Sequence, residues 1–232
     1  MNYDLQVLYE DNHLIAVNKP AGMLVHGDET GDKPLSEFVK AYIAEKYDKP
    51  GAVFLGVIHR LDRPVSGLVI FARTSKALAR MNRLLKERKI TKTYLAITSD
   101  RPDPHRGKLV HFILKDRSRN VAKAYDRRGS RTQEAKESVL EYRLVASLDT
   151  YHLLEVNPHT GRPHQIRVQL SKLGCPILGD VKYDYPRPRR DGSILLHSYE
   201  MTFEHPVKRE PFRLTAAVPS LKEWALFSEF LT

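Results

Sequence analysis

Short apolar stretches that come in pairs constrain the fold of this chain more than any other feature of its sequence. LQVLYEDNHLIAVNK contains one pair, LGVIHRLD and GLVIFAR form a second, and SVLEYRLVASL and YHLLEVNP form a third. Apolar stretches of this length, bounded by turn-forming residues, predict β-strands. Strand pairs with a few helices between them predict an α+β architecture around a largely antiparallel mixed β-sheet. We expect residues 1–232 to form a single domain.

Four segments have helical spacing. PLSEFVKAYIAEKY repeats its apolar residues at helical intervals, and Thr74 suits the cap of a basic helix over 74–89. In TGRPHQIRVQLSKLG, Pro163 suits the first turn of a helix and Gly174 its end. SLKEWALFSEFL predicts a closing helix with Trp224 facing inward.

The charge balance points to a polyanionic partner. The 232 residues include 38 Lys and Arg against 28 Asp and Glu, which gives a formal net charge of +10. Nucleic acid is then the first partner to consider, although the same balance also fits a chain that is basic for solubility. Basic residues gather in the helix over 74–89, in a loop over 115–131, and in KYDYPRPRR. The segment 100–137 is expected to form a short hairpin and a mobile basic loop.

Cysteine usage and hydropathy indicate the compartment. The chain has one cysteine, Cys175, so it holds no disulfide framework and no cysteine-based zinc or iron–sulfur site. The N-terminal segment lacks the basic start and apolar core of a signal peptide, and no apolar run reaches transmembrane length. We expect a cytoplasmic protein without membrane association and, because no spare apolar helix face stands out, a monomer.

Asp62 is the first candidate for chemistry. It lies between Arg60 and Arg63 in HRLDRPVSG, and these cations favour its ionised form. An ionised carboxylate on a loop between two core strands is suited to act as a nucleophile or a base. A structural salt bridge would use the same residues, so the local sequence leaves both interpretations open.

HTGRPHQIR is the second candidate. His164 and Arg167 are three positions apart, so a helix presents them on one face. Arg167 lies among apolar residues, and a buried arginine needs a carboxylate partner, for which Asp62 is a candidate. His159 and His164 lack His-x-x-x-His spacing, so we expect hydrogen-bonding or phosphate-facing histidines and no metal site.

Tyr94 is the third candidate. In TKTYLAIT, strand alternation places it with Lys92 on the less apolar side. A tyrosine in a strand usually serves packing, but the neighbouring lysine strengthens the case for a functional role. Walker A, dinucleotide-fingerprint, Gly-x-Ser-x-Gly and His-Glu-x-x-His motifs are missing from the sequence, which argues against nucleotide cofactors, serine hydrolases and zinc proteases.

Five stretches, in order, resemble the RluA family of RNA pseudouridine synthases. They are YEDNHLIAVNKPAGMLVH, HRLDRPVSGLVIFAR, KTYLAI, HTGRPHQIRVQLSKLGCPILGDVKY and LLHSYEMTFEHP. Since they run through most of the chain, the sequence is identified as a member of that family. The resemblance implies the pseudouridine synthase fold, isomerisation of specific uridines in ribosomal or transfer RNA, and a reaction without cofactor or metal.

The resemblance also implies residue roles. Asp62 corresponds to the aspartate that attacks the target uridine, so that the base detaches and rejoins through carbon. Tyr94 corresponds to the tyrosine that stacks on the base and helps to remove the C5 proton. Arg167 corresponds to the arginine that pairs with the aspartate, and Arg60 to an arginine that fills the place of the flipped base.

Further RNA contacts are expected from side chains in or beside these motifs: His59, Arg63, Lys92, Arg162 and His164. Lys19 and Pro20 match the Lys-Pro of the first motif and are expected to be structural. The chain departs from many relatives at Val65, where they have threonine, and we expect no separate N-terminal RNA-binding domain. The target RNA and uridine stay open.

The main alternative is a non-catalytic RNA-binding or RNA-folding protein on the same fold. Such a protein would keep the basic surface, but it would not need Asp62, Tyr94 and Arg167 together. A hydrolase of the glycosidase type would need a second carboxylate close to Asp62, and it is not favoured.

Overall fold

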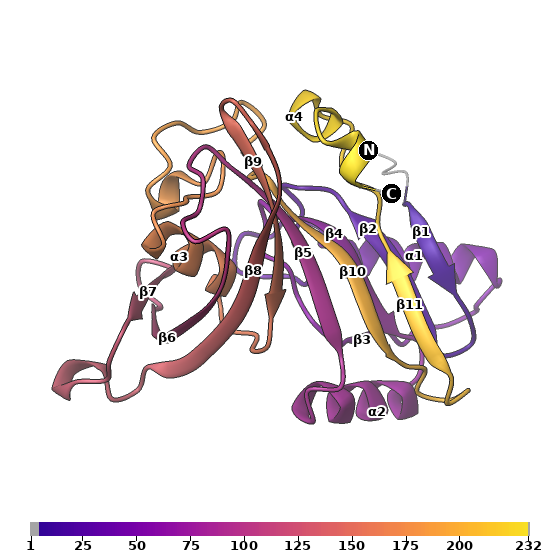
Figure 1. The fold of residues 1–232 in the computed structure, drawn as a ribbon. Coiled ribbons are helices and arrows are strands. Elements are labelled where there is room, and N and C mark those ends of the chain that lie inside the picture. Colours follow the sequence, from indigo (N-terminus) through magenta and orange to yellow (C-terminus); the bar gives the residue numbers. More distant parts are fainter. Residues whose placement is uncertain (1–4, 232) are drawn as a thin grey trace. The chain divides into compact units, whose positions relative to one another are not determined.

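A computed structural model describes residues 5–231, and the chain divides into two compact units (Figure 1). Among these described residues, the first unit consists of residues 5–91 and His197–Pro219, and the second of Lys92–Leu196 and residues 220–231. Strands in both units pair mostly antiparallel, and helices pack beside them, which confirms the predicted α+β class with a mixed, largely antiparallel sheet. Within the described residues, the helices are too short or too polar to cross a lipid bilayer.

The first unit is organised around one buried strand. Its elements are β1 (Val7–Glu10), β2 (Leu14–Lys19), α1 (Leu35–Lys46), β3 (Gly56–Val57), β4 (Ser66–Ala72), α2 (Ser75–Lys86), β10 (Leu196–Glu204) and β11 (Pro211–Thr215). Every residue of β4 is buried. β4 pairs antiparallel with β2 and β3 and parallel with β10, while β1 pairs with β2 and β11 with β10.

Helix α2 covers one face of this strand group (Figure 1). The Thr74 hydroxyl accepts a hydrogen bond from the Ala77 N–H at 3.1 Å, which confirms the predicted cap. Ala77 and Met81 are buried against the apolar face of β4, together with Leu68 and Ile70. The basic side chains of α2 are therefore left on the faces that point to solvent.

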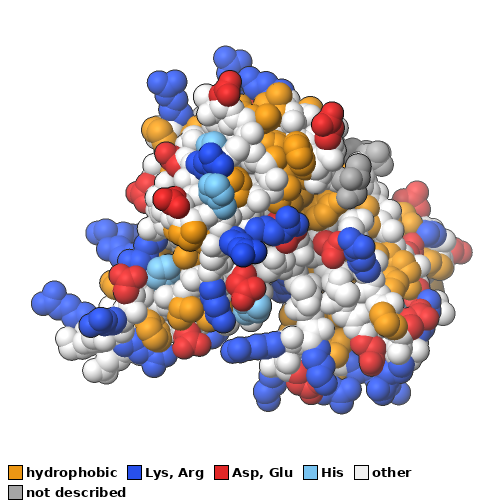
Figure 2. All heavy atoms as spheres, viewed as in Figure 1, with side chains coloured by type: hydrophobic (Ala, Val, Ile, Leu, Met, Phe, Trp, Pro, Cys, Tyr) orange, Lys and Arg blue, Asp and Glu red, His pale blue; other side chains and the backbone are white. Residues whose placement is uncertain are grey.

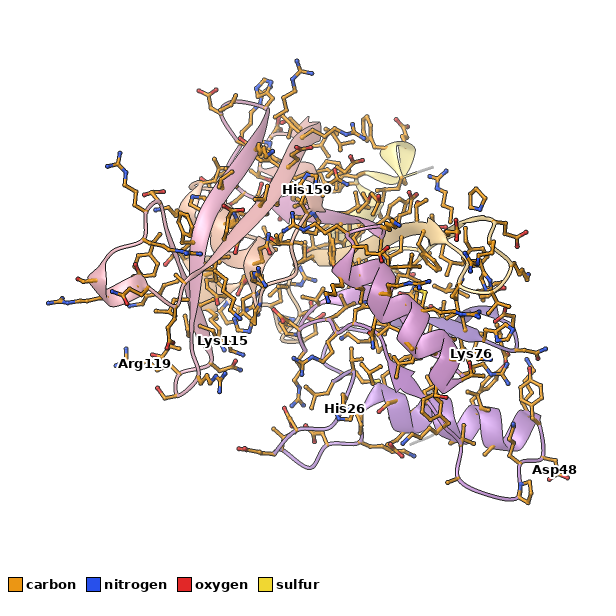
Figure 3. All side chains as sticks on the ribbon, turned by 90° about the horizontal axis from the view of Figure 1, so that it is seen from below. His26, Asp48, Lys76, Lys115, Arg119 and His159 are labelled. Atoms are coloured by element: carbon orange, nitrogen blue, oxygen red, sulfur yellow. The ribbon has the colours of Figure 1, made fainter. Side chains whose placement is uncertain are left out.

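The second unit is an antiparallel meander with helices beside it. Its elements are β5 (Thr91–Thr98), β6 (Arg106–Asp116), β7 (Val121–Tyr125), β8 (Lys136–Leu148), β9 (Tyr151–Pro158), α3 (Gln165–Lys172) and α4 (Lys222–Ala225), with 3₁₀ turns at Ser130–Thr132, Val181–Tyr183 and Ser228–Phe230. The strand order is β5-β9-β8-β6-β7. The predicted hairpin is β6–β7, from which Lys115 and Arg119 extend (Figure 3). Helix α3 packs on this hairpin through Val168 and Ala122.

Three element predictions were wrong in extent. The strand expected over 55–62 is only Gly56–Val57, and the rest is an irregular loop in which Ile58 and Leu61 are buried. Helix α3 starts at Gln165, after Pro163, while Gly174 ends it with a φ of 85° as predicted. The closing helix stops at Ala225 and continues as a 3₁₀ turn.

The start of β4 is fastened to β10. Gly67 has a φ of 115°, and a Cβ there would lie 2.3 Å from the backbone oxygen of Ser198, so only glycine permits this approach. His197 Nε2–H donates to Ala216 O at 3.0 Å, which leaves Nδ1 to accept from the Ser66 hydroxyl at 2.9 Å. His197 is fully buried, and burial lowers its pKa to about 4.

The stability of this anchor should depend on pH. The unfolded chain protonates His197 near pH 6.5 and the folded chain only near pH 4, so the unfolded state binds more protons between those values. Stability should therefore fall as the pH drops from about 6.5 to 4, by roughly 3 kcal/mol from this group. Urea unfolding at several pH values would measure it. The difference between wild type and His197→Gln should shrink on acidification, whereas exposed His26→Gln should stay parallel to wild type; parallel curves for both variants would contradict the assignment.

Candidate active site

The Asp62 loop, residues 58–65, is a fixed part of the first unit. Val65 N–H donates to Asp62 O at 3.0 Å, and Gly22 N–H donates to Arg63 O at 2.8 Å. The Arg63 side chain returns a bond to Gly22 O at 3.0 Å and forms an ion pair with Asp32 at 2.7 Å. The loop is thus fixed to the turn after β2, and it carries a half-buried Asp62 just before β4.

Lys19 holds the same loop from the interior. Its side chain is fully buried at the end of β2, and Nζ donates to the carbonyl oxygens of Pro20, Met23 and Arg63 at 2.9, 2.8 and 3.3 Å. Burial lowers the pKa of Lys19 to about 7, and the negative charge of Asp62 acts in the opposite direction. A buried amine therefore lies within electrostatic reach of Asp62, and the structural role predicted for Lys19 has a geometric basis.

The three other predicted residues of this loop differ in their surroundings. His59 Nε2 accepts a hydrogen bond from the Ile70 N–H of β4 at 3.1 Å, so this ring atom serves the architecture. Arg60 is exposed, as a residue that is expected to meet RNA should be. Arg63 is half-exposed and is shared between Gly22 and Asp32.

Arg167 lies in the second unit and forms a buried pair with Asp180. Its Nε and Nη2 atoms donate to the two carboxylate oxygens of Asp180, each at 2.7 Å. Both side chains are almost fully buried, at 6% and 1% exposed. This bidentate geometry is the strongest that an arginine and a carboxylate can form, and it fixes the plane of the guanidinium group. Sequence reasoning recognised that Arg167 needs a carboxylate but did not find Asp180.

Tyr183 supports the face of the same guanidinium group. The Arg167 Cζ atom lies 4.9 Å from the centre of the Tyr183 ring, within the range of a cation–π contact. The Tyr183 hydroxyl accepts from the Ala122 N–H of β7 at 2.8 Å and is also hydrogen-bonded to His164 Nδ1 at 2.6 Å. Asp180, Tyr183 and His164 together form the Arg167 network.

Removing one oxygen atom tests this network. Tyr183→Phe keeps the ring against Arg167 but leaves the buried Ala122 N–H without its acceptor, so we expect a loss of about 1–2 kcal/mol in unfolding free energy. Urea unfolding of purified protein would measure it. Tyr185→Phe, a partly buried tyrosine two residues away, is the matched control and should change stability by less than about 0.5 kcal/mol. Equal effects of the two variants would contradict the proposed bonding.

His164 has an uncommon backbone conformation. Its φ is 55°, in the left-handed region, although it is not glycine. It immediately precedes α3, where the bond to Tyr183 holds its side chain. Arg162 lies beside it, and its N–H donates to Gln165 Oε1 at 3.0 Å. The prediction that His164 and Arg167 share one face of a helix was wrong, because His164 precedes the helix; both residues nevertheless contact Tyr183.

Tyr94 is in β5 opposite Val156 of β9 and is 8% exposed. The strand is buried on both sides from Tyr94 to Thr98, so the predicted less apolar face does not exist there. Burial also lowers the pKa of Lys92. Asn157 fixes the strand start, donating to Thr93 Oγ1 at 3.0 Å. Tyr94 is therefore a rigidly held aromatic ring.

The predicted residues fall into two groups. Asp62 and its neighbours in the sequence belong to the first unit, whereas Tyr94, Arg167 and His164 belong to the second. Sequence reasoning missed the roles of Asp180, Tyr183 and His197, although all three lie inside the motifs. Across residues 5–231, no three His, Cys, Asp or Glu side chains are grouped as a metal site.

Comparison with known proteins identifies the class. Residues 13–172 match the model of the RNA pseudouridylate synthase family. The chain is 32% identical to the Vibrio cholerae tRNA pseudouridine synthase C, over 97% of this chain and 96% of that protein. It is also 32% identical to the Borreliella burgdorferi ribosomal large subunit pseudouridine synthase D, over 88% of this chain and 62% of that one.

A solved structure agrees with these matches. Human RNA pseudouridylate synthase domain containing 4 superposes with a TM-score of 0.77 and 27% identity, over 93% of this chain and 89% of that chain. The fold and the order of motifs therefore define an RNA pseudouridylate synthase. Within that class, the chain belongs to the RluA family, as its sequence motifs predicted.

Proposed function

We propose that Asp62 is the nucleophile with which this RluA-family isomerase converts uridine in ribosomal or transfer RNA into pseudouridine. One observation carries the proposal: Asp62 sits half-buried on a loop that Lys19 and Gly22 hold in place. A nucleophile must reach the sugar–base bond in a fixed geometry, and a fixed loop provides it. The buried Lys19 amine lies within electrostatic reach of the same carboxylate.

The reaction needs no other reagent. The bond from C1′ to N1 breaks and a bond from C1′ to C5 forms, while C5 loses a proton and N1 gains one. In this proposal, Tyr94 stacks on the detached base and assists removal of the C5 proton. Arg167 is the cation that favours the ionised nucleophile, and the Asp180 carboxylate keeps its guanidinium in one plane.

RNA contacts complete the proposal. Flipping the uridine out of its stack costs a few kcal/mol, which phosphate contacts and stacking offset. The proposed RNA contacts are Arg60, Arg63, Arg162 and His164. His59 is bonded to β4 through Nε2, so we propose only an indirect part for it in RNA binding. We further propose that the protein acts as a cytoplasmic monomer and that its two units together form one catalytic domain.

Pseudouridine mapping tests the activity and finds the target. Total RNA from cells with and without this protein would be labelled with carbodiimide and read by primer extension, with wild type or Asp62→Asn restored. Transfer RNA is the first class to read, because the relative that matches over nearly its whole length is named a transfer RNA enzyme. We expect one or a few positions to lose their label without the protein and to regain it only with wild type. Unchanged positions in both RNA classes would favour the non-catalytic RNA-binding alternative.

A further inference from the structure

Helix α2 carries many more positive charges than the acidic residues next to it in the chain can neutralise. From Ser75 to Lys89 the chain has six Lys and Arg and one acidic residue, Glu87. Helix α1, of the same length and in the same unit, has two lysines and two glutamates. Glu87 forms its ion pair with Lys89, beyond the end of the helix. Within the described residues, no salt bridge reaches a Lys or Arg side chain between Lys76 and Lys86.

The cations are arranged in a row. Lys76, Arg80, Arg83 and Lys86 follow one another at intervals of four, three and three residues, which places them along one side of the helix. Their positions are separated by about 4.5–6 Å along the helix axis. Arg80 is held in place because it donates to Pro206 O at 3.0 Å, while Lys76, Arg83 and Lys86 are exposed. Figure 2 shows Lys and Arg side chains gathered along the lower edge, where Figure 1 places α2.

Helix stability does not account for this row. Cations favour the C-terminal end of a helix and disfavour the N-terminal end, so the macrodipole explains Lys86 but opposes Lys76. Figure 3 labels Lys76 beside α2. The first turn of α2 contains no acidic residue that would offset it. The charge at this end of the helix therefore needs an explanation outside the helix.

The surroundings and the charge of this row indicate which kind of partner it binds. A basic amphipathic helix can lie on a membrane only if its apolar face is available to the lipid. The apolar face of α2 is already used, because Ala77 and Met81 are buried and Leu78, Leu84 and Leu85 pack on the same core. With a membrane excluded, the remaining kind of partner is a polyanion, which is bound through charge alone. Closely spaced cations in a line fit successive phosphates of one nucleic-acid strand.

We propose that this α2 row, Lys76, Arg80, Arg83 and Lys86, binds the phosphate backbone of the RNA substrate. The proposal rests on the proposed function and extends it, because it assigns RNA binding to a surface of the first unit that contains none of the residues given a role in the chemistry. The row contributes to affinity for RNA in general and carries no sequence information, since phosphate contacts position a nucleic acid and do not specify its bases.

The test is the salt dependence of RNA binding. Lys76→Gln combined with Arg83→Gln removes two exposed cations and spares the Arg80 bond to Pro206. Lys40→Gln combined with Lys49→Gln removes two cations of the same unit, on and just after α1, and is the control of equal charge. Dissociation constants for unfractionated bacterial transfer RNA would be measured by fluorescence anisotropy between about 50 and 300 mM salt.

The expected result is specific to the row. The slope of log affinity against log salt should become shallower by about 1.5 in the α2 variant, and affinity at low salt should fall about tenfold. The control should keep the wild-type slope, and kcat at saturating RNA should be unchanged in both. An α2 variant that matches the control in slope would overturn the proposal. The binding assay does not depend on turnover, so the two proposals can fail separately. A wild-type protein that binds RNA through α2 but forms no pseudouridine would refute the proposed function and would still support the α2 row as an RNA-binding surface.

Discussion

Asp62→Asn should abolish pseudouridine formation while leaving the fold intact. The amide has the shape of the carboxylate but cannot act as a nucleophile, so we expect the rate to fall by more than about 10³-fold. The backbone bonds that hold the loop, from Val65 and Gly22, do not involve the side chain of Asp62. Unfolding free energy should therefore change by less than about 1 kcal/mol, and RNA affinity should stay near the wild-type value. Release of tritium from RNA labelled at C5 of uridine measures the rate directly.

Asp32→Asn is the matched control for that variant. Asp32 lies in the same unit, is 54% exposed and forms an ion pair with Arg63 at 2.7 Å, so it is a second carboxylate close to the loop. Exposed pairs contribute little, and we expect this variant to keep wild-type turnover. If Asp62→Asn retained a rate close to that of Asp32→Asn, the assignment of the nucleophile would be wrong.

Loss of Asp180 should have the largest effect on stability. Asp180→Ala leaves Arg167 charged and buried without the two hydrogen bonds at 2.7 Å, and such a loss costs about 3–5 kcal/mol. Turnover should fall as well, because the guanidinium group loses its fixed plane. Urea unfolding and the tritium-release assay would measure the two effects. Asp184→Asn, which alters an exposed residue four positions further on, should leave both unchanged.

A double variant separates structure from chemistry at this pair. Arg167→Met with Asp180→Leu replaces the buried ions by apolar side chains of similar size, and replacements of this kind are often neutral or stabilising. We expect the double variant to be more stable than Asp180→Ala but to remain without turnover. Wild-type activity in the double variant would show that Arg167 has only a structural role.

Local pattern predicted most elements, and the reasons are visible in particular residues. Strands β8 and β9 were predicted because their apolar stretches are bounded by the turn at Asp149 and Thr150. Helix α2 was predicted because Thr74 caps it and its apolar spacing is regular. The strand expected over 55–62 failed because apolar residues such as Ile58 and Leu61 reach the core equally well from an irregular loop.

The site was predictable in its motifs but not in its partners. Arg167 was expected to be buried from its apolar neighbours, yet its carboxylate partner lies 13 residues further along the chain, across an irregular connection. Tyr183 and His197 act through hydrogen bonds to the backbone groups of Ala122 and Ala216, and no sequence spacing reports such contacts. Lys19 was expected to be structural from family resemblance, while its complete burial follows only from the surrounding fold.

The burial of Lys19 has a consequence for the chemical reactivity of the chain. An amine with a pKa of about 7 is about half uncharged at pH 7, and the uncharged form is nucleophilic, which makes Lys19 intrinsically more reactive than an ordinary lysine. Yet no part of the side chain is exposed, so acylating reagents reach it only when the turn after β2 opens. Its acylation rate therefore reports how often the segment that holds the Asp62 loop comes apart, through a probe that the chain already contains.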